Sequence, residues 1–301
     1  MIIIRLVGGL GNQLFQYALG RHLSLINNQE LKIDTSYYSG ATPNAQKGIR
    51  VYGLDNFNIS ATEASEAELR RSKKFFKSTL LARGLRKINR MRNFVNCYYM
   101  VEPENLYWKF QPSVLNKKIA KDVYIEGYWQ TEKYFIDIEP IIRRELSFKN
   151  TPDEVNMKLI NEIKNENSIA LHIRHGDNAN EYAKAHGVLP LDYYYKAINI
   201  IANKIENPSF YIFSDDPEWA RENLKLDFPT QYISHNGDIK NYEDLRLMSN
   251  CKHHIIGNST FSWWGAWLGK KANQIVIAPK YYQENHDISQ KDFYPDNWII
   301  I

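Results

Sequence analysis

One stretch, residues 251–268 (CKHHIIGNSTFSWWGAWL), constrains the fold more than any other part of the chain. Its apolar run at 254–256 has the length of a buried strand, and a Gly-Asn turn ends that run. Ser259 and Thr260 stand where a helix N-cap is expected, and residues 261–268 are predicted to form a helix with aromatic residues on several faces. Taken alone, the pattern is better explained as a capped core helix. It also matches the strand–turn–helix unit with which α/β folds bind phosphate.

The rest of the C-terminal half alternates short strands with helices. Expected strands are residues 168–171, 210–213, 254–256 and 274–278, and expected helices are residues 154–164, 191–205, 217–224, 242–249 and 261–268. Strands that alternate with helices at short intervals predict a parallel sheet with helices on both faces.

Polar residues follow three of these strands, at 172–177, 214–216 and 257–260. In a doubly wound sheet, ligands bind at the carboxyl ends of the strands, so the three loops should converge. Together they offer a guanidinium, carboxylates, hydroxyls and a helix N-terminus, a set that suits a nucleotide diphosphate. Arg174 can hold phosphate oxygens, and Asp215 or Asp216 can accept hydrogen bonds from the base or ribose. The candidate donor-binding residues here are Arg174, His175, Ser214, Asp215, Asp216, Asn258, Ser259, Thr260 and Phe261.

The N-terminal end predicts a βα unit with a strand at 2–7, a glycine-rich turn at 8–13 and a helix at 14–26. A dinucleotide fingerprint is disfavoured, because Leu14 stands where the third glycine or an alanine belongs. The glycines still allow a backbone to approach a ligand, and amide side chains can contact it. A tight turn without a ligand explains the spacing equally well. The candidate donor-binding residues in this turn are Gly9, Gly11, Asn12 and Gln13.

The middle of the chain is less regular. Expected elements are a strand at 31–34, an irregular insertion at 37–58, helical structure at 62–92, a strand at 123–127 and a helix at 132–145. Residues 148–153, with Asn, Thr and Pro, are the best candidate for a linker. At 301 residues, the chain has room for two domains of about 150 residues each, and we expect them at 1–150 and 151–301.

The small net charge of +4 is unevenly distributed, since residues 70–92 contain ten basic and no acidic residues. The usual explanation of such a segment is a solvated helix face. Peripheral contact with anionic membrane lipid is a second interpretation, at roughly 1 kcal/mol per charge. Nucleic acid is disfavoured as a partner, because no recognisable binding module accompanies the segment.

The two cysteines, Cys97 and Cys251, do not make a disulfide framework. No apolar run approaches the length of a membrane span, and the apolar residues at the N-terminus are too few for a signal sequence. These features predict a cytoplasmic protein, with peripheral contact at the inner membrane face as the second interpretation.

Metal binding is not expected. No Asp-x-Asp pair occurs, and His172 with His175 makes a poor zinc site without a third obvious ligand. If a diphosphate leaves at this site, protein donors must neutralise it, which gives Arg174 the main part.

Four motifs together resemble the bacterial α-1,2-fucosyltransferases of glycosyltransferase family 11. They are residues 8–17 (GGLGNQLFQY), 172–177 (HIRHGD), 213–216 (FSDD) and 257–268 (GNSTFSWWGAWL). The resemblance spans nearly the whole chain, and the last motif is highly specific. It implies a GT-B-like α/β architecture with two Rossmann-like domains facing a central cleft. The C-terminal domain would hold the donor GDP-fucose, and the N-terminal domain would face the acceptor.

One residue departs from the family pattern, which usually reads His-x-Arg-Arg-Gly-Asp in its first catalytic motif, because His175 stands at the second arginine. The resemblance therefore assigns the diphosphate to Arg174. It implies an inverting displacement without metal, in which the acceptor hydroxyl attacks the anomeric carbon opposite GDP. Asp177 is the first candidate for a general base, followed by Glu126 and His175, although a turn-capping role explains Asp177 equally well. The candidate catalytic residues are Arg174, Asp177, His172 and Glu126.

The implied activity is transfer of L-fucose from GDP-β-L-fucose to the 2-hydroxyl of a terminal β-galactoside in an oligosaccharide. GDP-fucose is then a substrate, and no cofactor is expected. Two alternatives stay open. One is another GDP-sugar transferase, such as an α-1,6- or protein O-fucosyltransferase, and the other is a non-catalytic protein that binds GDP or a glycan.

Overall fold

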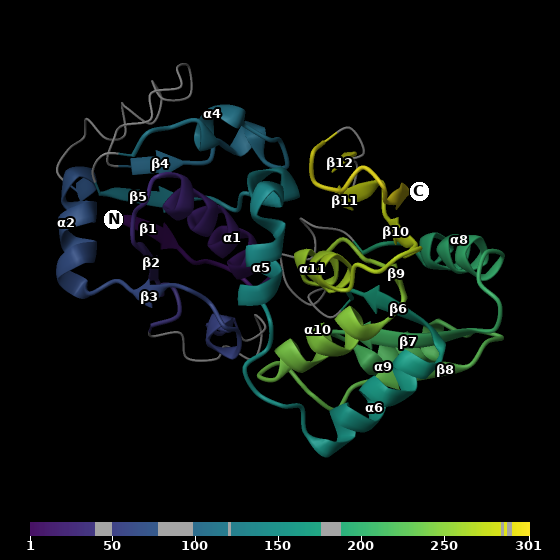
Figure 1. Cartoon of the computed structure of the whole chain (residues 1–301). Helices are drawn as coiled ribbons and strands as arrows, with labels where there is room; N and C mark the ends of the chain where they lie inside the picture. Colours follow the sequence, from purple (N-terminus) through teal and green to yellow (C-terminus); the bar gives the residue numbers. More distant parts are fainter. Residues whose placement is uncertain (40–49, 78–98, 120–121, 176–187, 284–285, 288–290) are drawn as a thin grey trace. The chain divides into compact units, whose positions relative to one another are not determined.

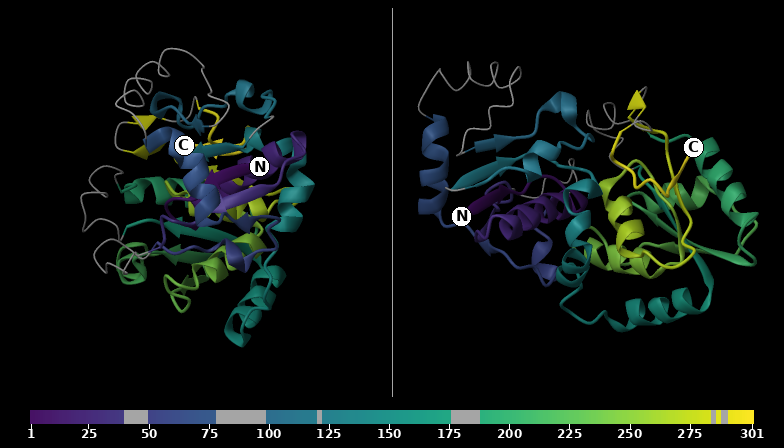
Figure 2. Two further views of the ribbon diagram at one scale, coloured as in Figure 1. Left: turned by 90° about the vertical axis from the view of Figure 1, so that its left-hand side faces the viewer. Right: turned by 45° about the horizontal axis from the view of Figure 1, so that its top comes forward.

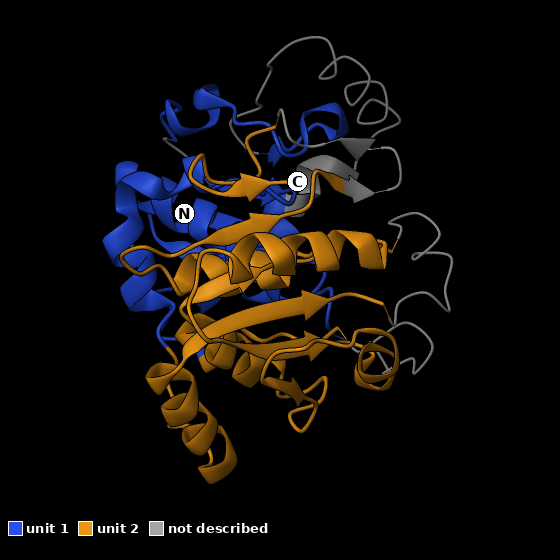
Figure 3. Ribbon diagram, turned by 90° about the vertical axis from the view of Figure 1, so that its right-hand side faces the viewer, with its two compact units in different colours: residues 1–41, 57–147 blue, residues 42–56, 148–301 orange. Residues whose placement is uncertain are grey.

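The computed structural model describes residues 1–39, 50–77, 99–119, 122–175, 188–283, 286–287 and 291–301, with backbone only at 73–77, 282–283 and 286–287. The chain divides into two compact units, which Figure 3 colours separately. Unit 1 comprises residues 1–41 and 57–147, and unit 2 comprises residues 42–56 and 148–301. No helix in the described ranges is long and apolar enough to cross a membrane.

Unit 1 is built on a parallel sheet of five strands in the order β3-β2-β1-β5-β4 (Figure 1). Ile2, Ile3 and Ile4 of β1 are all fully buried, as expected for the central strand of a parallel sheet covered on both faces. The elements of unit 1 are β1 (Ile2–Arg5), α1 (Leu10–Ile26), β2 (Leu31–Asp34), β3 (Thr62–Glu63), α2 (Glu66–Lys77), β4 (Tyr99–Val101), η2 (Glu104–Leu106), α4 (Pro112–Leu115), β5 (Val123–Glu126), η3 (Glu132–Tyr134), η4 (Ile136–Ile138) and α5 (Glu139–Glu145).

Unit 2 is built on a second parallel sheet, of six strands in the order β13-β10-β9-β6-β7-β8. A two-stranded antiparallel ribbon, β11 with β12, stands apart from it. The elements of unit 2 are η1 (Leu54–Asn56), α6 (Glu154–Asn165), β6 (Asn167–Ile173), α8 (Leu191–Ala202), β7 (Pro208–Ser214), α9 (Pro217–Asn223), β8 (Thr230–Ile233), α10 (Asn241–Asn250), β9 (His253–Ile255), α11 (Thr260–Leu268), β10 (Val276–Ala278), β11 (Tyr281–Gln283), β12 (His286–Asp287) and β13 (Ile299–Ile300).

Helices cover both faces of the sheet in unit 2. Alternate residues of β6, such as Ile169 and Leu171, pack with α8 and α9 on one face, while Ala170 packs with α6 and α10 on the other. Figure 2 shows α6 and α8 on opposite sides of the strands. The predicted α/β class with parallel sheets and helices on both faces is therefore confirmed.

Three predicted segments are corrected. Residues 132–145 do not form one helix, because Pro140 cannot occupy a helix interior and instead stands in the first turn of α5. Residues 62–63 form strand β3 rather than helix; α2 occupies 66–77, and residues 78–92 of the basic segment lie outside the described residues. Finally, α1 begins at Leu10, so much of the predicted glycine turn is helical.

Gly8 explains the early start of α1. Its φ of +79° is a conformation that other residues rarely adopt, and a Cβ there would lie 2.5 Å from Nδ2 of Asn12. The chain therefore reverses at Gly8, and Gly9 becomes the N-cap of α1. As a result, Gly11, Asn12 and Gln13 occupy the first turn of the helix.

Candidate functional site

The predicted donor-binding loops of unit 2 gather at one edge of its sheet. Strands β6, β7 and β9 are parallel and adjacent, with Ile173 of β6 level with Ser214 of β7. Their carboxyl ends therefore open at the same edge, which we call rim 2: the loops that follow β6, β7 and β9, with the N-terminus of α11. This is where ligands bind in open α/β sheets.

His175 joins two of the loops in rim 2. Its backbone N–H donates to Oδ1 of Asp215 at 2.7 Å, and its ring Nδ1 lies 2.9 Å from Oδ2 of Asp216. The ring stacks on Trp219, with 3.9 Å between centroids and 12° between planes. His175, which departs from the family pattern, is thus held between the carboxylate of Asp216 and the indole of Trp219.

The two aspartates shape rim 2 from within. Asp216 is the N-cap of α9 and accepts the backbone N–H of Trp219 at 3.1 Å, while its own N–H donates to Oγ of Ser214 at 3.0 Å. Asp215 accepts from His175, as described above. Ser214, Asp215 and Asp216 therefore position the loops, in addition to any contact they make with a ligand. Sequence reasoning missed Trp219, whose place on the first turn of a predicted helix beside the aspartates was the available signal.

His172, at the end of β6, is kept neutral. Burial lowers the pKa of its imidazole to about 4, opposed by the charge of Asp215 and reinforced by that of Arg174. Its Nδ1 is buried and has no hydrogen-bond partner among the described residues. The site therefore contains an uncharged ring nitrogen at physiological pH.

Gly257 lets the end of β9 approach His172 closely. A Cβ at this position would lie 3.0 Å from the backbone oxygen of His172 and 3.4 Å from its Nδ1. The contact with the backbone oxygen is tighter than ordinary side-chain packing, so a larger residue would push the two loops apart. The glycine thus keeps the N-terminus of α11 close to β6.

The N-terminus of α11 points its positive dipole end into rim 2. Ser259 caps the helix by accepting the N–H of Phe261 at 3.3 Å, which confirms the predicted N-cap. Asn258, Ser259 and Thr260 are buried, and Phe261 lies with its ring centroid 6.0 Å from that of His172. The first turn of α11 contains no acidic residue, so nothing on the helix itself offsets the dipole.

The body of α11 is fixed by the core. Trp263 and Trp264 are fully buried, and Nε1 of Trp263 donates to the carbonyl of Phe293 at 2.9 Å. Gly265 lies so close to α10 that a Cβ there would be 2.9 Å from Cβ of Met248. Core packing therefore sets the position of the helix tip.

Arg174 directly follows β6 and is half-buried, close enough to His172 to affect its pKa. The structure thus places the only arginine of the first motif at rim 2. Asp177, the first candidate for a general base, lies outside the described residues.

A fourth loop, which was not predicted, lies beside rim 2 at the same edge of the sheet. Strand β8 pairs in parallel with β7, so its carboxyl end brings His235 and Asn236 to the same edge. Nδ2 of Asn236 donates to Asp244 of α10 at 2.7 Å, and burial raises the pKa of Asp244 to about 7. The sequence analysis missed this loop because it did not identify β8.

The predicted site residues of unit 1 lie at the carboxyl edge of its own sheet. Gly9 caps α1, and Gly11 and Gln13 are buried, with Nε2 of Gln13 donating to the carbonyl of Gly8 at 3.3 Å. Asn12 is half-buried and accepts from Gln130. Gln13 therefore stabilises the turn, whereas a contact with a ligand was predicted for it.

Glu126 has partners for both of its carboxylate oxygens. Nη1 of Arg5 lies 2.7 Å from Oε1, and the hydroxyl of Tyr99 donates to Oε2. Each carboxylate oxygen keeps a further lone pair, so these interactions orient Glu126 and leave it able to accept a proton.

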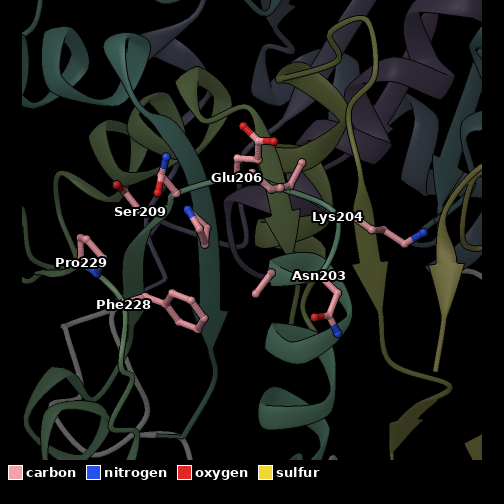
Figure 4. A pocket seen from close by; sticks show the side chains of 10 residues that line it. Asn203, Lys204, Glu206, Ser209, Phe228 and Pro229 are labelled. Atoms are coloured by element: carbon pink, nitrogen blue, oxygen red, sulfur yellow. The ribbon is translucent and has the colours of Figure 1, made fainter.

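A hollow of about 670 Å³ lies at the opposite edge of the sheet in unit 2, between the end of α8 and the start of β7 (Figure 4). Its lining includes Lys204, Glu206, Ser209 and Phe228. It lies at the amino end of β7, away from the loops of rim 2, and ligands of such sheets bind at the carboxyl ends. Within the described ranges, no cluster of three or more His, Cys, Asp or Glu residues has the arrangement of a metal site.

Comparison with known proteins agrees with this architecture. An alpha-1,2-colitosyltransferase of Escherichia coli is 34% identical over 313 residues, which cover 100% of this chain and 99% of the relative. The O-antigen biosynthesis glycosyltransferase WbnK of Escherichia coli is 32% identical over 310 residues, with 98% of each covered. Among solved structures, an arginine-to-lysine mutant of Arabidopsis thaliana FUT1 in complex with GDP has a TM-score of 0.53 at 13% identity, over 94% of this chain and 71% of that one.

The structural likeness shows a shared GT-B-like fold. The sequence likeness goes further, because the model of the family described as Glycosyl transferase family 11 matches residues 1–301. Together with relatives that are similar over their full length, this match shows that the chain is a glycosyltransferase that belongs to glycosyl transferase family 11.

Proposed function

We propose that the protein transfers L-fucose from GDP-β-L-fucose to the 2-hydroxyl of a terminal β-galactoside, with inversion and without a metal ion. The observation that carries the proposal is the composition of rim 2, where Arg174 and the N-terminus of α11 stand at the carboxyl edge of a parallel sheet. Both offer positive electrostatic potential to a diphosphate. The GDP in the related Arabidopsis FUT1 structure supports GDP as the nucleotide.

In the proposed mechanism, the bond between the anomeric carbon and the β-phosphate oxygen breaks as the acceptor hydroxyl attacks from the opposite face. Negative charge grows on the departing GDP, and Arg174 with the dipole of α11 stabilises it. His172 remains neutral beside Arg174, so it does not add to the charge but can accept or donate one hydrogen bond. Asp177 is the proposed acceptor of the proton from the attacking hydroxyl.

A second donor is favoured by one relative. The alpha-1,2-colitosyltransferase is similar to this chain over its whole length, and colitose differs from L-fucose by the lack of the 3-hydroxyl. GDP-colitose is therefore the competing donor. The ratio of the kcat/KM values for GDP-fucose and GDP-colitose shows which donor the protein prefers. A site that hydrogen-bonds the 3-hydroxyl of fucose should discriminate strongly against colitose, which lacks it.

The test is a donor and acceptor screen followed by linkage analysis of the product. Incubation with GDP-fucose and a β-galactoside should give an α-1,2 product, and another linkage or a lack of transfer would refute the proposal. Transfer from GDP-colitose but not from GDP-fucose would favour the competing donor.

Arg174→Ala should lower kcat by at least about 100-fold, the order of magnitude for a lost donor to a developing charge. The matched control is Arg70→Ala, since Arg70 is 78% exposed on α2 and pairs only with Glu66 in the part of the chain described.

A further inference from the structure

Three loops are linked at the carboxyl edge of the sheet in unit 1. Nε2 of Gln130 donates to Oδ1 of Asn12 at 2.9 Å, and Nε1 of Trp108 donates to Oε1 of Gln130 at 2.6 Å. Nε2 of Gln16 donates to the carbonyl of Gly127 at 3.0 Å. The loops after β1, β4 and β5 thus form a connected edge, which we call rim 1: residues 7–12, 102–108 and 127–130.

The backbone of rim 1 is strained at two large residues. Trp108 has a φ of 60° and Trp129 a φ of 56°, in the left-handed region that bulky side chains rarely adopt. Such conformations persist only where surrounding contacts enforce them, and they concentrate at functional sites. Trp108 and Trp129 lie in two loops that a hydrogen bond from Trp108 to Gln130 joins. Two strained residues in linked loops indicate a functional surface rather than a simple connection between strands.

Glu102 stabilises the strained loop at 127–130 through hydrogen bonds to its backbone. It is 3% exposed, and its Oε2 accepts the backbone N–H groups of Tyr128 and Trp129 at 2.7 and 3.0 Å. A Cβ at Gly127 would lie 2.5 Å from Cβ of Glu102, so the loop packs directly against this side chain. Since both N–H groups belong to the backbone, these two hydrogen bonds do not depend on the side chain of Tyr128.

This arrangement presents two tyrosines at the surface of rim 1. The rings of Tyr107 and Tyr128 meet edge to face, with 5.7 Å between centroids and 82° between planes. Both side chains are half-buried, and Tyr107 also contacts the ring of Trp108, with 6.4 Å between centroids. Tyrosines of this kind offer an apolar face and a hydroxyl that can form hydrogen bonds. A pyranose has the complementary form, with an apolar face of C–H groups and a polar edge.

The charges in rim 1 and the adjacent strand ends favour a neutral ligand. Rim 1 contains no lysine or arginine, and the adjacent Arg5 is paired with Glu126. Of its two carboxyl groups, Glu104 is exposed and Glu102 keeps its proton up to a pH of about 7, because burial raises its pKa. A diphosphate would therefore find no cation in rim 1, whereas an uncharged sugar needs none.

From this geometry we infer that Tyr107 and Tyr128 form a platform for the pyranose ring of the acceptor galactoside. The inference rests on the proposed function and adds the residues that select the acceptor. One ring face stacks on the C–H face of the sugar, and the second ring, nearly perpendicular to the first, borders the sugar at its side. Glu102 keeps the loop rigid without touching the ligand.

The test compares Tyr107→Ala, Tyr128→Ala, Tyr128→Leu and Tyr128→Phe. The alanine variants and Tyr128→Leu should raise the acceptor KM at least tenfold with the donor KM unchanged, whereas Tyr128→Phe keeps the ring and should stay within twofold. The matched control is Tyr195→Ala, because Tyr195 is 37% exposed on α8 in unit 2. This substitution should leave both KM values unchanged. An unchanged acceptor KM in both alanine variants, or an equal rise of both KM values, would overturn the inference.

A binding measurement separates this inference from the proposed function. Saturation-transfer NMR with methyl β-galactoside should show contact between the wild-type protein and the ring protons, and Tyr128→Ala should abolish it. Calorimetric binding of GDP should be the same in wild type and Tyr128→Ala. Loss of the galactoside signal alone supports the platform, and a signal that persists in Tyr128→Ala refutes it. A wild-type protein that fails to bind GDP would refute the proposed function instead.

Discussion

Glu102 offers a quantitative test of the reasoning about unit 1. Burial raises the pKa of its carboxyl to about 7 from an ordinary value of 4.5, although two backbone N–H groups oppose the rise. The unfolded chain therefore releases this proton at lower pH than the folded protein does. The free energy of unfolding should fall as the pH rises from 4.5 to 7 and stay low above it.

The magnitude follows from the same values. At about 1.4 kcal/mol for each tenfold change, ionisation of Glu102 costs about 3 kcal/mol of stability at pH 8 and less than about 1 kcal/mol at pH 5. Glu102→Gln removes the buried charge and keeps an oxygen that can accept both N–H groups. At pH 8 the variant should therefore be about 3 kcal/mol more stable than the wild type, with most of this gain absent at pH 5.

Urea denaturation of both proteins at pH 5 and pH 8, followed by tryptophan fluorescence, measures this difference. Glu104→Gln is the matched control, because Glu104 lies on the same loop and is exposed, so its substitution should have no pH-dependent effect. A stability gain of equal size at both pH values would refute the account of Glu102. So would a variant that is less stable than the wild type at pH 8.

Three further outcomes are expected. Burial lowers the pKa of His172 to about 4, so as the pH falls the unfolded chain takes up this proton before the folded protein does. The free energy of unfolding of the wild type should therefore fall by up to about 3 kcal/mol between pH 6.5 and 4, relative to that of His172→Asn. Parallel curves of unfolding free energy against pH for the two proteins would contradict this. Gly265→Ala should destabilise the protein by about 1–3 kcal/mol in thermal unfolding, since the new Cβ would lie 2.9 Å from Cβ and 3.0 Å from Sδ of Met248. Met248→Ala removes the Sδ contact and keeps the Cβ contact, so it should relieve part of the loss; strictly additive costs would argue against the Sδ contact. Transfer should be equal with EDTA and with magnesium, and activity that a chelator abolishes and magnesium restores would end the proposal of a metal-free mechanism.

Much of unit 2 could be predicted from the sequence because its strands are short apolar runs that end in polar residues. The continuous run in β6 and the cap of α11 at Ser259 are both of this kind. Strand β8 escaped detection because it lies at the sheet edge and three of its four residues, including Thr230 and Gln231, are not buried. Strand β4 was missed as well, since three residues are too few to show a period.

The candidate sites could be predicted only where the functional residues directly follow a predicted strand in the sequence. The spacing of Arg174, Asp215 and Ser259 at strand ends predicted a common edge, and the parallel register puts their loops there. The stacking of His175 on Trp219 and the burial of Glu102 depend on contacts between distant segments. Such contacts leave no local pattern in the sequence, so they required the structure.

The close packing of α11 against α10 has a consequence for protein engineering. The tryptophans of α11 and the fit of Gly265 against Met248 locate its N-terminus, so the proposed diphosphate site is anchored to tightly packed interior residues. Substitutions at those interior positions should therefore score as inactive in any screen for altered sugar preference, even though they touch no substrate. Libraries that seek new acceptors are better confined to surface loops, where a changed side chain leaves the scaffold as it is.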